Sequence, residues 1–359
     1  AAAVAAAVAA ADATILKLNT ILERRKEFPL RHRNKIIELA EEYLTQLGDD
    51  IYDMITDRND PDSNEYRGLD YHRDTEAEIE TAITFFPETL SRVTDDGLIP
   101  IQRIMFAFRT NLKFKYNLKA ASFIAILALL GIRLNQFEEA ERGGLLVGND
   151  DVFNTLQYLV YNSHSSYGEE HHQIVDNVCL TLLIRLRRLG LLKKKDVCEQ
   201  DLVLHVCAGD NYFAESRFRF LVEWNPSSLL HTYTNGRSPL HYAARYLPIQ
   251  GFRSIFEYVI RYYPNKTGIL LLFKKDSDGD TPFQLICNKY PPQRHKELRE
   301  FVDDTFTRYG NITPVNVMDA LLSASTDRII HVDCVYTLLR RHPVAVLNEL
   351  RSGQTNNNN

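Results

Sequence analysis

The sequence predicts an all-α protein built as a helical-repeat solenoid, in which pairs of helices stack along one axis. Three observations support this fold class. A tight turn followed at once by a helix start recurs along the chain, proline stops alternate with these starts, and amphipathic segments fill the intervals. Each helix pair of such an array buries its apolar face only against a neighbouring pair, so the repeats depend on one another for stability.

The clearest helix start lies at 235–244. Gly236 supplies the positive φ that a tight turn needs. Ser238 is a good N-cap, and Pro239 fits the first helical position, where a missing N–H costs nothing. The apolar residues that follow Pro239 recur at i, i+3 and i+4, which predicts a short amphipathic helix.

The same start recurs at 276–284 around Gly279, and more weakly at 96–102 around Gly97. We therefore interpret Gly97, Gly236 and Gly279 as structural turn residues. A further copy is expected at 311–316, and degraded copies are expected at 154–157 and 202–205. Val203, Pro239, Pro282 and Pro314 stand at equivalent positions and are 36, 43 and 32 residues apart. A regular array of this kind repeats at about 33 residues, so the helix pairs are kept while their connections vary.

Proline follows the second helix of several units. Phe86-Pro87, Asn225-Pro226 and His342-Pro343 carry this mark, and Tyr263-Pro264 matches in part. Because proline removes a backbone donor and restricts the residue before it, each mark predicts the end of a helix.

Four segments are expected: N-terminal helices at 1–48, a linker or ordered loop at 49–73, the repeat domain at 74–350 and a tail at 351–359. In the first segment, helices are predicted at 14–28 and 33–47, with Gly48 as the stop. Residues 1–11, almost all alanine, fit either a real poly-alanine tract or a helix of unassigned sequence written as alanine. The helices expected in the repeat domain are 75–86, 100–109, 118–130, 155–161, 172–189, 203–208, 213–224, 239–246, 252–262, 282–288, 295–309, 314–324 and 332–341.

The amino-acid composition is that of a globular protein and gives no sign of a nucleic-acid-binding or membrane-spanning chain. Hydrophobic content of 45% and charged content of 25% are those of an ordinary globular protein, and the net charge of −5 gives no basic field for nucleic acid. No apolar run reaches the ~18–20 residues of a membrane span. Five cysteines without a CxxC pair indicate a reducing compartment. We expect an intracellular, most simply cytoplasmic protein; an organelle stays open because the true N-terminus may be missing.

These starts and stops resemble the ankyrin-repeat superfamily. A narrower likeness, to the multi-copy ankyrin-like proteins of diatoms, rests on six segments that together span most of 66–350: 66–70, 117–120, 141–146, 217–224, 272–276 and 333–336. The resemblance implies a structural role for His205 and His241, bonding to backbone in the neighbouring loop, with Gln157, Gln284 and Asn316 acting alike. The chain departs from standard ankyrin units by lacking their Leu-Leu-x-x-Gly-Ala-Asp ending. The diatom group implies no common activity.

Three clusters of charged residues and histidines suggest a metal site or a nucleic-acid contact. Asp276 to Asp280 looks like the start of a calcium loop, but Thr281 and Cys287 stand where an EF-hand needs Gly and Glu, which favours a turn. Glu169 and His172, in the His164–His172 cluster, have a Glu-x-x-His spacing but no second such pair. The basic run from Arg185 to Lys195 fits a solvated helix face better than a nucleic-acid contact.

The sequence therefore favours a non-enzymatic interaction scaffold without cofactor or metal, whose partner is another protein or a multi-subunit complex. The predicted partner-binding residues combine turn positions, arginine and tyrosine: Tyr233, Arg237, Tyr242, Arg245 and Tyr246. Two alternatives stay open. One is a permanent accessory or regulatory subunit of a larger assembly, anchored by the N-terminal helices. The other is a metal-dependent enzyme that uses the His164–His172 cluster. The oligomeric state is not predicted.

Overall fold

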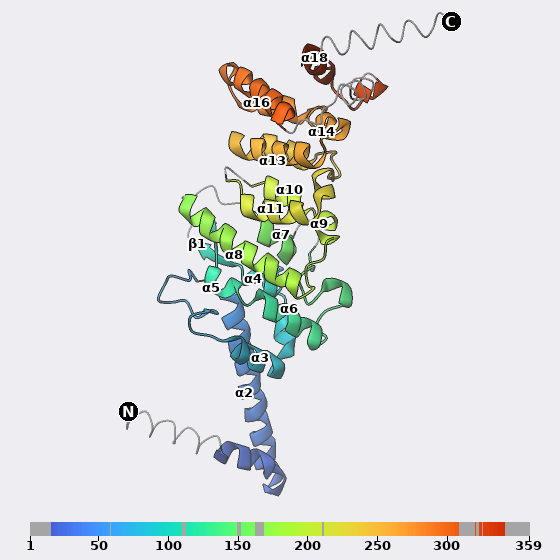
Figure 1. Cartoon of the computed structure of the whole chain (residues 1–359). Coiled ribbons are helices and arrows are strands. Elements are labelled where there is room, and N and C mark those ends of the chain that lie inside the picture. Colours follow the sequence, from blue (N-terminus) through green and yellow to red (C-terminus); the bar gives the residue numbers. More distant parts are fainter. Residues whose placement is uncertain are drawn as a thin grey trace, which may run out of the picture.

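The structure is a computed structural model, and it is predominantly helical (Figure 1). The fold class predicted from the sequence, all-α, is confirmed at this level. The helices follow one another from α2, near the N-terminus, to α18 at the opposite end of the molecule. The residues that the structure describes are 16–57, 59–109, 113–148, 152–161, 169–209, 212–308, 320, 323–324 and 326–341.

The body contains short helices that each begin a unit and longer helices that follow them. The short helices are α4 (Pro100–Arg103), α7 (Thr155–Val160), α10 (Leu202–Cys207), α12 (Pro239–Tyr246) and α15 (Pro282–Lys289). The longer helices are α3 (Glu76–Phe85), α6 (Ile124–Arg133), α8 (Glu169–Arg188), α11 (Glu215–Trp224), α13 (Ile249–Tyr262) and α16 (His295–Arg308). The remaining helices are α2 (Leu30–Thr56), α5 (Leu118–Ala121), α9 (Asp196–Glu199), α14 (Lys266–Leu271) and α18 (Val332–Arg341).

Neighbouring units touch through both sets of helices. The short helices contact one another in the order α4, α7, α10, α12 and α15, and the longer ones in the order α3, α6, α8 and α11, with α13 against α16. Aromatic rings continue this second row, because Phe218 on α11 meets Tyr258 on α13, and Phe256 on α13 meets Phe306 on α16. One hydrophobic core therefore runs from Ile51 to Ile330.

The ends of α3, α8 and α11 lie where proline and glycine predict them. Helices α3 and α11 end at Phe85 and Trp224, just before Pro87 and Pro226, which begin the 3-10 turns η2 (Pro87–Leu90) and η4 (Pro226–Leu229). Helix α8 ends at Arg188, and Gly190 follows at φ +73°. The remaining 3-10 turns are η1 (Arg25–Glu27), η3 (Glu139–Glu141) and η5 (Pro292–Arg294). The marks predicted at 311–316 and 342–343, and the segments 1–11 and 351–359, lie outside the described residues.

Gly48 is not a helix stop, so the predicted boundary between 1–48 and 49–73 is wrong. Helix α2 runs through Gly48 to Thr56. Its last turns are held by burial of Ile51 and Ile55 in the core, and a Cβ at Gly48 would lie 3.1 Å from a ring carbon of Phe86. Gly48 therefore permits a close approach between α2 and the next unit, and tertiary packing outweighs its low helix propensity.

The predicted helix over 100–109 is also wrong beyond its first turn. Helix α4 ends at Arg103, and strands β1 (Phe106–Arg109) and β2 (Lys113–Tyr116) form an antiparallel hairpin that pairs Phe106 with Tyr116. The second strand alternates polar and apolar residues, the period of a strand, whereas the first is apolar from Phe106 to Phe108. A further β contact is the isolated antiparallel bridge between Lys274 and Ile330.

The structure also bears on membrane insertion. Within the described residues, none of the helices combines the length and apolarity needed to cross a membrane.

Candidate functional site

The turn residues predicted from the sequence build one repeated structure. Gly97, Gly236 and Gly279 have φ of +79°, +75° and +87°. In each of these turns, which we call tips, the glycine N–H donates a hydrogen bond to the carbonyl of the residue three positions earlier. The N–H of that earlier residue donates in turn to the carbonyl of the residue just after the glycine, as between Tyr233 and Arg237 at 3.0 Å. The three glycines therefore take the left-handed backbone of a tight turn, and the three tips at 94–98, 233–237 and 276–280 share one backbone pattern.

In every short helix except α10, the residue three positions after the N-cap carries a polar side chain that can hydrogen-bond to the next unit. In α12, His241 Nδ1 accepts from the Ser238 N–H at 3.1 Å, and its Nε2–H donates to the Lys274 carbonyl at 3.0 Å. Burial lowers the pKa of His241 to about 4, so the ring is neutral at pH 7 and both of its nitrogens are engaged. The structural role expected for this histidine is confirmed.

Glutamine performs the same task in other units. Gln102 accepts from the Ile99 N–H and donates to the carbonyls of Val147 and Phe153 at 2.8 and 2.9 Å. Gln157 accepts from Asn154 and donates to the Gln200 carbonyl at 3.4 Å.

Three equivalent positions differ. Gln284 accepts a hydrogen bond from the Thr281 N–H, and its side-chain nitrogen lies 3.1 Å from Nε2 of His331. Its partner in the next unit is therefore a side chain and not the backbone group that the sequence predicts. His205 packs edge-on against Phe153 at 4.6 Å, and burial lowers its pKa to about 4. Asn316 lies outside the described residues.

Arg237, which the sequence predicts as a partner-binding residue, binds side chains of its own chain. Its Nε lies 2.8 Å from Asp276 Oδ2, and its Nη2 lies 2.5 Å from Asp278. Only 14% of the side chain is exposed. Because both aspartates belong to the neighbouring tip, Arg237 joins two units.

Asp276 is held from three sides. Burial opposes its ionisation, but the Arg237 guanidinium and the backbone N–H groups of Asp278 and Asp280 outweigh burial and lower the pKa of this carboxylate. The segment from Asp276 to Asp280, which resembles the start of a calcium loop, therefore forms a turn in which the Asp276 carboxylate binds Arg237.

The other predicted partner-binding residues form a patch around the start of α12, which we call the tyrosine patch: Tyr233, Tyr242, Arg245 and Tyr246. Tyr233 is 45% exposed, Arg245 is exposed, and Tyr242 and Tyr246 are half-buried. The rings of Tyr242 and Tyr246 stack at 6.0 Å. Burial raises the pKa of Tyr242, against the lowering effect of a hydrogen bond from Asn235 and of the nearby Arg237 guanidinium.

Buried ion pairs that the sequence did not reveal connect distant segments. Arg217 on α11 and Asp176 on α8 are both buried, with Nε and Oδ1 2.7 Å apart, and Arg217 also donates to the Leu159 carbonyl. Arg142 pairs with the buried Asp196 at 2.5 Å. The partners stand 41 and 54 residues apart, and nothing in their local sequence signals the pairing.

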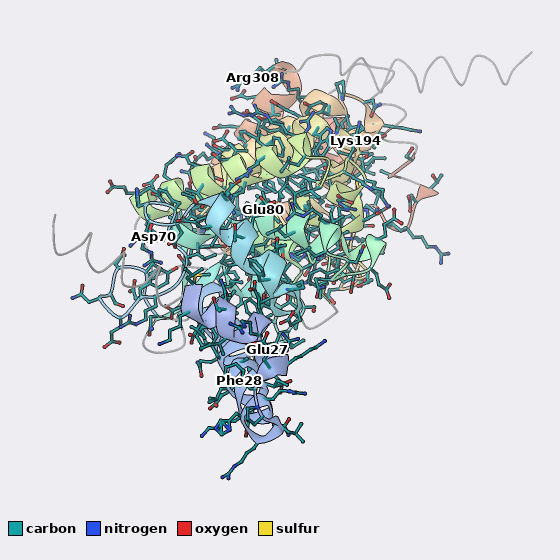
Figure 2. All side chains as sticks on the ribbon, turned by 90° about the horizontal axis from the view of Figure 1, so that it is seen from below. Glu27, Phe28, Asp70, Glu80, Lys194 and Arg308 are labelled. Atoms are coloured by element: carbon teal, nitrogen blue, oxygen red, sulfur yellow. The ribbon has the colours of Figure 1, made fainter. Side chains whose placement is uncertain are left out.

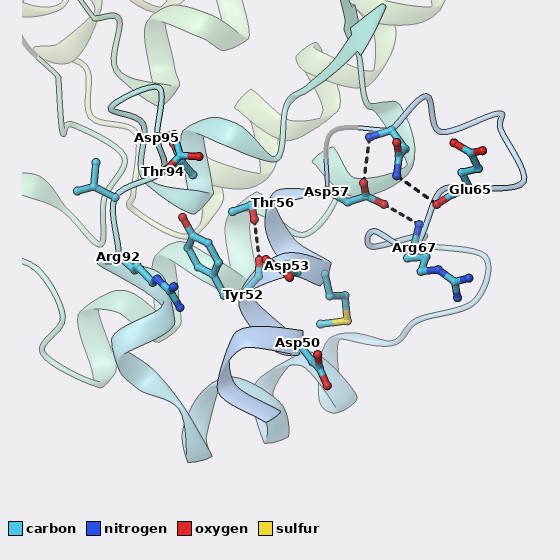
Figure 3. Close-up of a pocket in the computed structure, with 13 residues that line it drawn as sticks. Asp50, Tyr52, Asp53, Thr56, Asp57, Glu65, Arg67, Arg92, Thr94 and Asp95 are labelled. Carbon is cyan, nitrogen blue, oxygen red and sulfur yellow. Dashed lines mark hydrogen bonds between the residues drawn. The ribbon is translucent and has the colours of Figure 1, made fainter. Parts of the chain in front are cut away.

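A hollow of about 700 Å³ lies beside the end of α2 (Figure 3). Its lining is rich in acidic residues, although Arg92 lies 4.3 Å over the Tyr52 ring and 2.6 Å from Asp49. Asp57 accepts from the N–H groups of Asn59 and Arg67, and so orders the loop that follows α2.

The His164–His172 cluster is not gathered into a site in the part of the chain that can be described. His164 lies outside that part. Glu169 is exposed, whereas His172 is buried and stacks on Tyr212 at 4.7 Å. Among the described residues, no group of three or more His, Cys, Asp or Glu side chains is placed to hold a metal ion.

Two arginines of the basic run at 185–195 contact neighbouring helices. Arg185 pairs with Glu76 at 2.6 Å, and the Arg187 guanidinium lies 4.3 Å over the Trp224 ring.

Comparison of the chain with protein-family models, with curated proteins and with solved structures found no match. Function is therefore inferred from the residues themselves.

Proposed function

We propose that the chain is an ankyrin-like helical-repeat protein that acts as a non-enzymatic scaffold for binding another protein. The single observation that carries this proposal is the tyrosine patch. It presents three tyrosines and one arginine, residue types that often dominate interface energies, on a backbone that is held rigid.

Preorganisation supports the same proposal. The tip that carries Tyr233 is fixed by Gly236 and by the pairing of Arg237 with Asp276, and α12 is fixed by His241. A partner therefore binds side chains that are already in place, and loses little conformational entropy in ordering them. His241 itself serves structure, since both of its ring nitrogens are engaged.

A photo-crosslinking amino acid at Tyr233 tests the proposal in native extract. We expect a discrete crosslinked product whose second component mass spectrometry identifies. The matched control carries the same group at Lys296 on α16, whose side chain is 86% exposed. Products of equal yield from both positions would contradict a localised binding surface.

With the partner purified, Tyr233→Ala and Arg245→Ala test the energetics. Each is expected to weaken binding by about 1–2 kcal/mol while leaving the melting temperature unchanged, because neither side chain is buried. Arg245 replaces Arg237 in this experiment, since Arg237 stabilises the stack. Unchanged affinity in both variants would place the binding surface elsewhere.

The alternative of a permanent accessory subunit is favoured by exposed apolar residues on α2, such as Leu30 and Leu44. It predicts that the chain elutes from native extract only in a large complex, whereas a scaffold with exchangeable partners also elutes free.

A further inference from the structure

The chain folds back on itself at the end of α8 and carries a cluster of cations there. Gly190 takes φ +73°, and the Leu191 N–H donates to the Leu186 carbonyl at 2.9 Å, which turns the chain over the last helical turn. Exposed cations lie on both sides of this glycine. We call them the basic turn: Arg187, Arg188, Lys193 and Lys194.

The backbone of the basic turn is held by neighbouring side chains. Asn225 Nδ2 donates to the Lys194 carbonyl at 3.1 Å. The Lys193 N–H donates to the Asp196 carboxylate at 2.6 Å, and this carboxylate is itself buried and paired with Arg142. The lysine side chains therefore extend from a fixed backbone, so a ligand does not have to order the segment that carries them.

The charges of the basic turn are uncompensated. Among the described residues, none of its four cations forms an ion pair with a carboxylate, whereas the adjacent Lys195 is paired with Glu199 at 2.9 Å. Cations stabilise the C-terminus of a helix, which accounts for the two arginines at the end of α8. The two lysines instead precede the N-terminus of α9, where the helix dipole gives cations no such benefit. The fold therefore gives no reason for the lysines, which favours a ligand outside it.

An aromatic surface adjoins these cations. The Arg187 guanidinium lies 4.3 Å over the ring of Trp224, which is half-buried, and 5.7 Å over the ring of Phe220. The residue after Trp224 is Asn225, which binds the Lys194 carbonyl, so Trp224 connects the two halves of the basic turn. Arginine and tryptophan often dominate the energies of interfaces. A guanidinium already placed on a ring also loses little freedom when it binds a carboxylate.

We propose that the basic turn binds a short acidic segment, rich in aspartate or glutamate, of a partner protein. Carboxylates supply the charge that the four cations lack, in charge-assisted hydrogen bonds. A nucleic acid fits less well, because its phosphates extend beyond four cations and meet a chain whose net charge is −5. The basic turn lies between α8 and α9 and the tyrosine patch lies on α12, so this inference does not depend on the proposed function.

Trp224 is the single tryptophan of the chain, so its fluorescence reports on the basic turn. We expect titration of the full chain with a short peptide that alternates glutamate and serine to change this fluorescence until it saturates. Calorimetry should give the same affinity, which weakens with salt because exposed charges are screened. The same peptide with glutamine in place of glutamate is not expected to bind. Absence of binding by calorimetry at low salt, or binding that leaves the Trp224 emission unchanged, would overturn the proposal.

Substitution of the two lysines locates the site. Lys193→Gln with Lys194→Gln is expected to weaken peptide binding on the order of fivefold and to keep the melting temperature, because both side chains are exposed. The matched control is Arg31→Gln with Lys35→Gln, which removes the same charge from α2, away from Lys194 (Figures 1 and 2). It is expected to bind as wild type does. Equal weakening in both variants would show that net charge attracts the peptide, and would overturn the site.

Two further measurements test the identity and the independence of this surface. Oligothymidylate and vesicles that contain phosphatidylserine, at matched charge concentration, are expected to bind at least about tenfold more weakly than the acidic peptide. Tighter binding of either one would overturn the assignment to an acidic protein segment. Tyr233→Ala is expected to bind the peptide as wild type does, so failure of the tyrosine patch and failure of the basic turn are distinguishable.

Discussion

At the scale of single residues, the most consequential side chains are charged or polar groups buried between units. Arg217 and Asp176 have 0% and 2% of their side chains exposed and form one hydrogen-bonded ion pair. Removing charges from water is costly, and a buried pair is maintained only while each partner compensates the other. Such a pair fixes the packing of α8 against α11, and its effect appears when one partner is removed.

Asp176→Asn is therefore expected to lower the free energy of unfolding by about 3–5 kcal/mol, because it leaves the Arg217 guanidinium buried without its counter-charge. Guanidinium chloride denaturation measures the change. Glu199→Gln, which breaks the exposed Lys195–Glu199 pair, is the control and should cost at most about 1 kcal/mol. Equal effects in the two variants would show that burial does not determine the energetics of the pair.

His241 makes stability depend on pH. Its pKa is lowered to about 4 in the folded chain, chiefly by burial, against about 6.5 in the unfolded chain. Between these values the unfolded chain binds more protons, so stability is lost as pH falls from about 6.5 towards 4, by up to about 3 kcal/mol.

His241→Gln is expected to remove this part of the acid sensitivity while keeping most of the stability at pH 7, because glutamine already performs the task at Gln102 and Gln157. Urea denaturation between pH 4 and 7.5 measures both effects. Replacing the exposed His72 by Gln is the control, and its pH profile should match wild type. A His241→Gln profile as steep as wild type would contradict this role of the ring.

At the scale of elements, the tips show how strongly a single backbone conformation restricts the choice of residue. Gly279 has φ +87°, and a Cβ there meets nothing within 4 Å, so any cost of substitution comes from the backbone. Gly279→Val is expected to destabilise by about 1–3 kcal/mol, since a β-branched residue fits this region poorly. Gly279→Asn is the matched control and should cost less, because asparagine tolerates the left-handed region. Equal melting temperatures for all three chains would contradict the strain argument.

Elements governed by local chemistry could be predicted from the sequence. The tip glycines, the Ser238–Pro239 helix start and the proline stops each act through their own backbone and its nearest neighbours. The misses have non-local or competing causes. Helix α2 passes Gly48 because Ile51 and Ile55 are buried by later units, and the strands from Phe106 to Tyr116 follow a proline start that favours helix.

The candidate site divides in the same way. The exposure of Tyr233 has a local cause, its place in a turn. The burial of Arg237 has a distant cause, because its partner Asp276 lies 39 residues further along the chain. Sequence patterns predict which residues stand at a tip. They do not predict which tip lies beside another, so they cannot separate an arginine that binds a partner from one that binds the next unit.

At the scale of the whole molecule, each unit touches its neighbours through few but recurrent contacts. Between the tips at 233–237 and 276–280, the Asn235 carbonyl accepts from the Ser277 N–H at 3.0 Å, and Arg237 bridges to both aspartates. In the helical-repeat solenoid that we propose for this chain, stability is expected to be close to a sum of unit terms and nearest-neighbour terms. Damage at one junction should therefore spread to the adjoining units and fade with distance.

Arg237→Ala tests this expectation. The substitution leaves the buried Asp276 carboxylate without its cation and should cost on the order of 1–3 kcal/mol. Amide hydrogen exchange followed by mass spectrometry should show faster exchange in α12 and α15, on the two sides of the junction, and rates close to wild type in α3 and α6. Glu199→Ala on α9, which breaks the exposed pair with Lys195 four residues earlier, is the control and should change exchange little. Faster exchange along the whole chain would mean that the molecule unfolds as one unit, and unchanged exchange in α15 would mean that the Arg237 bridge does not couple the two units.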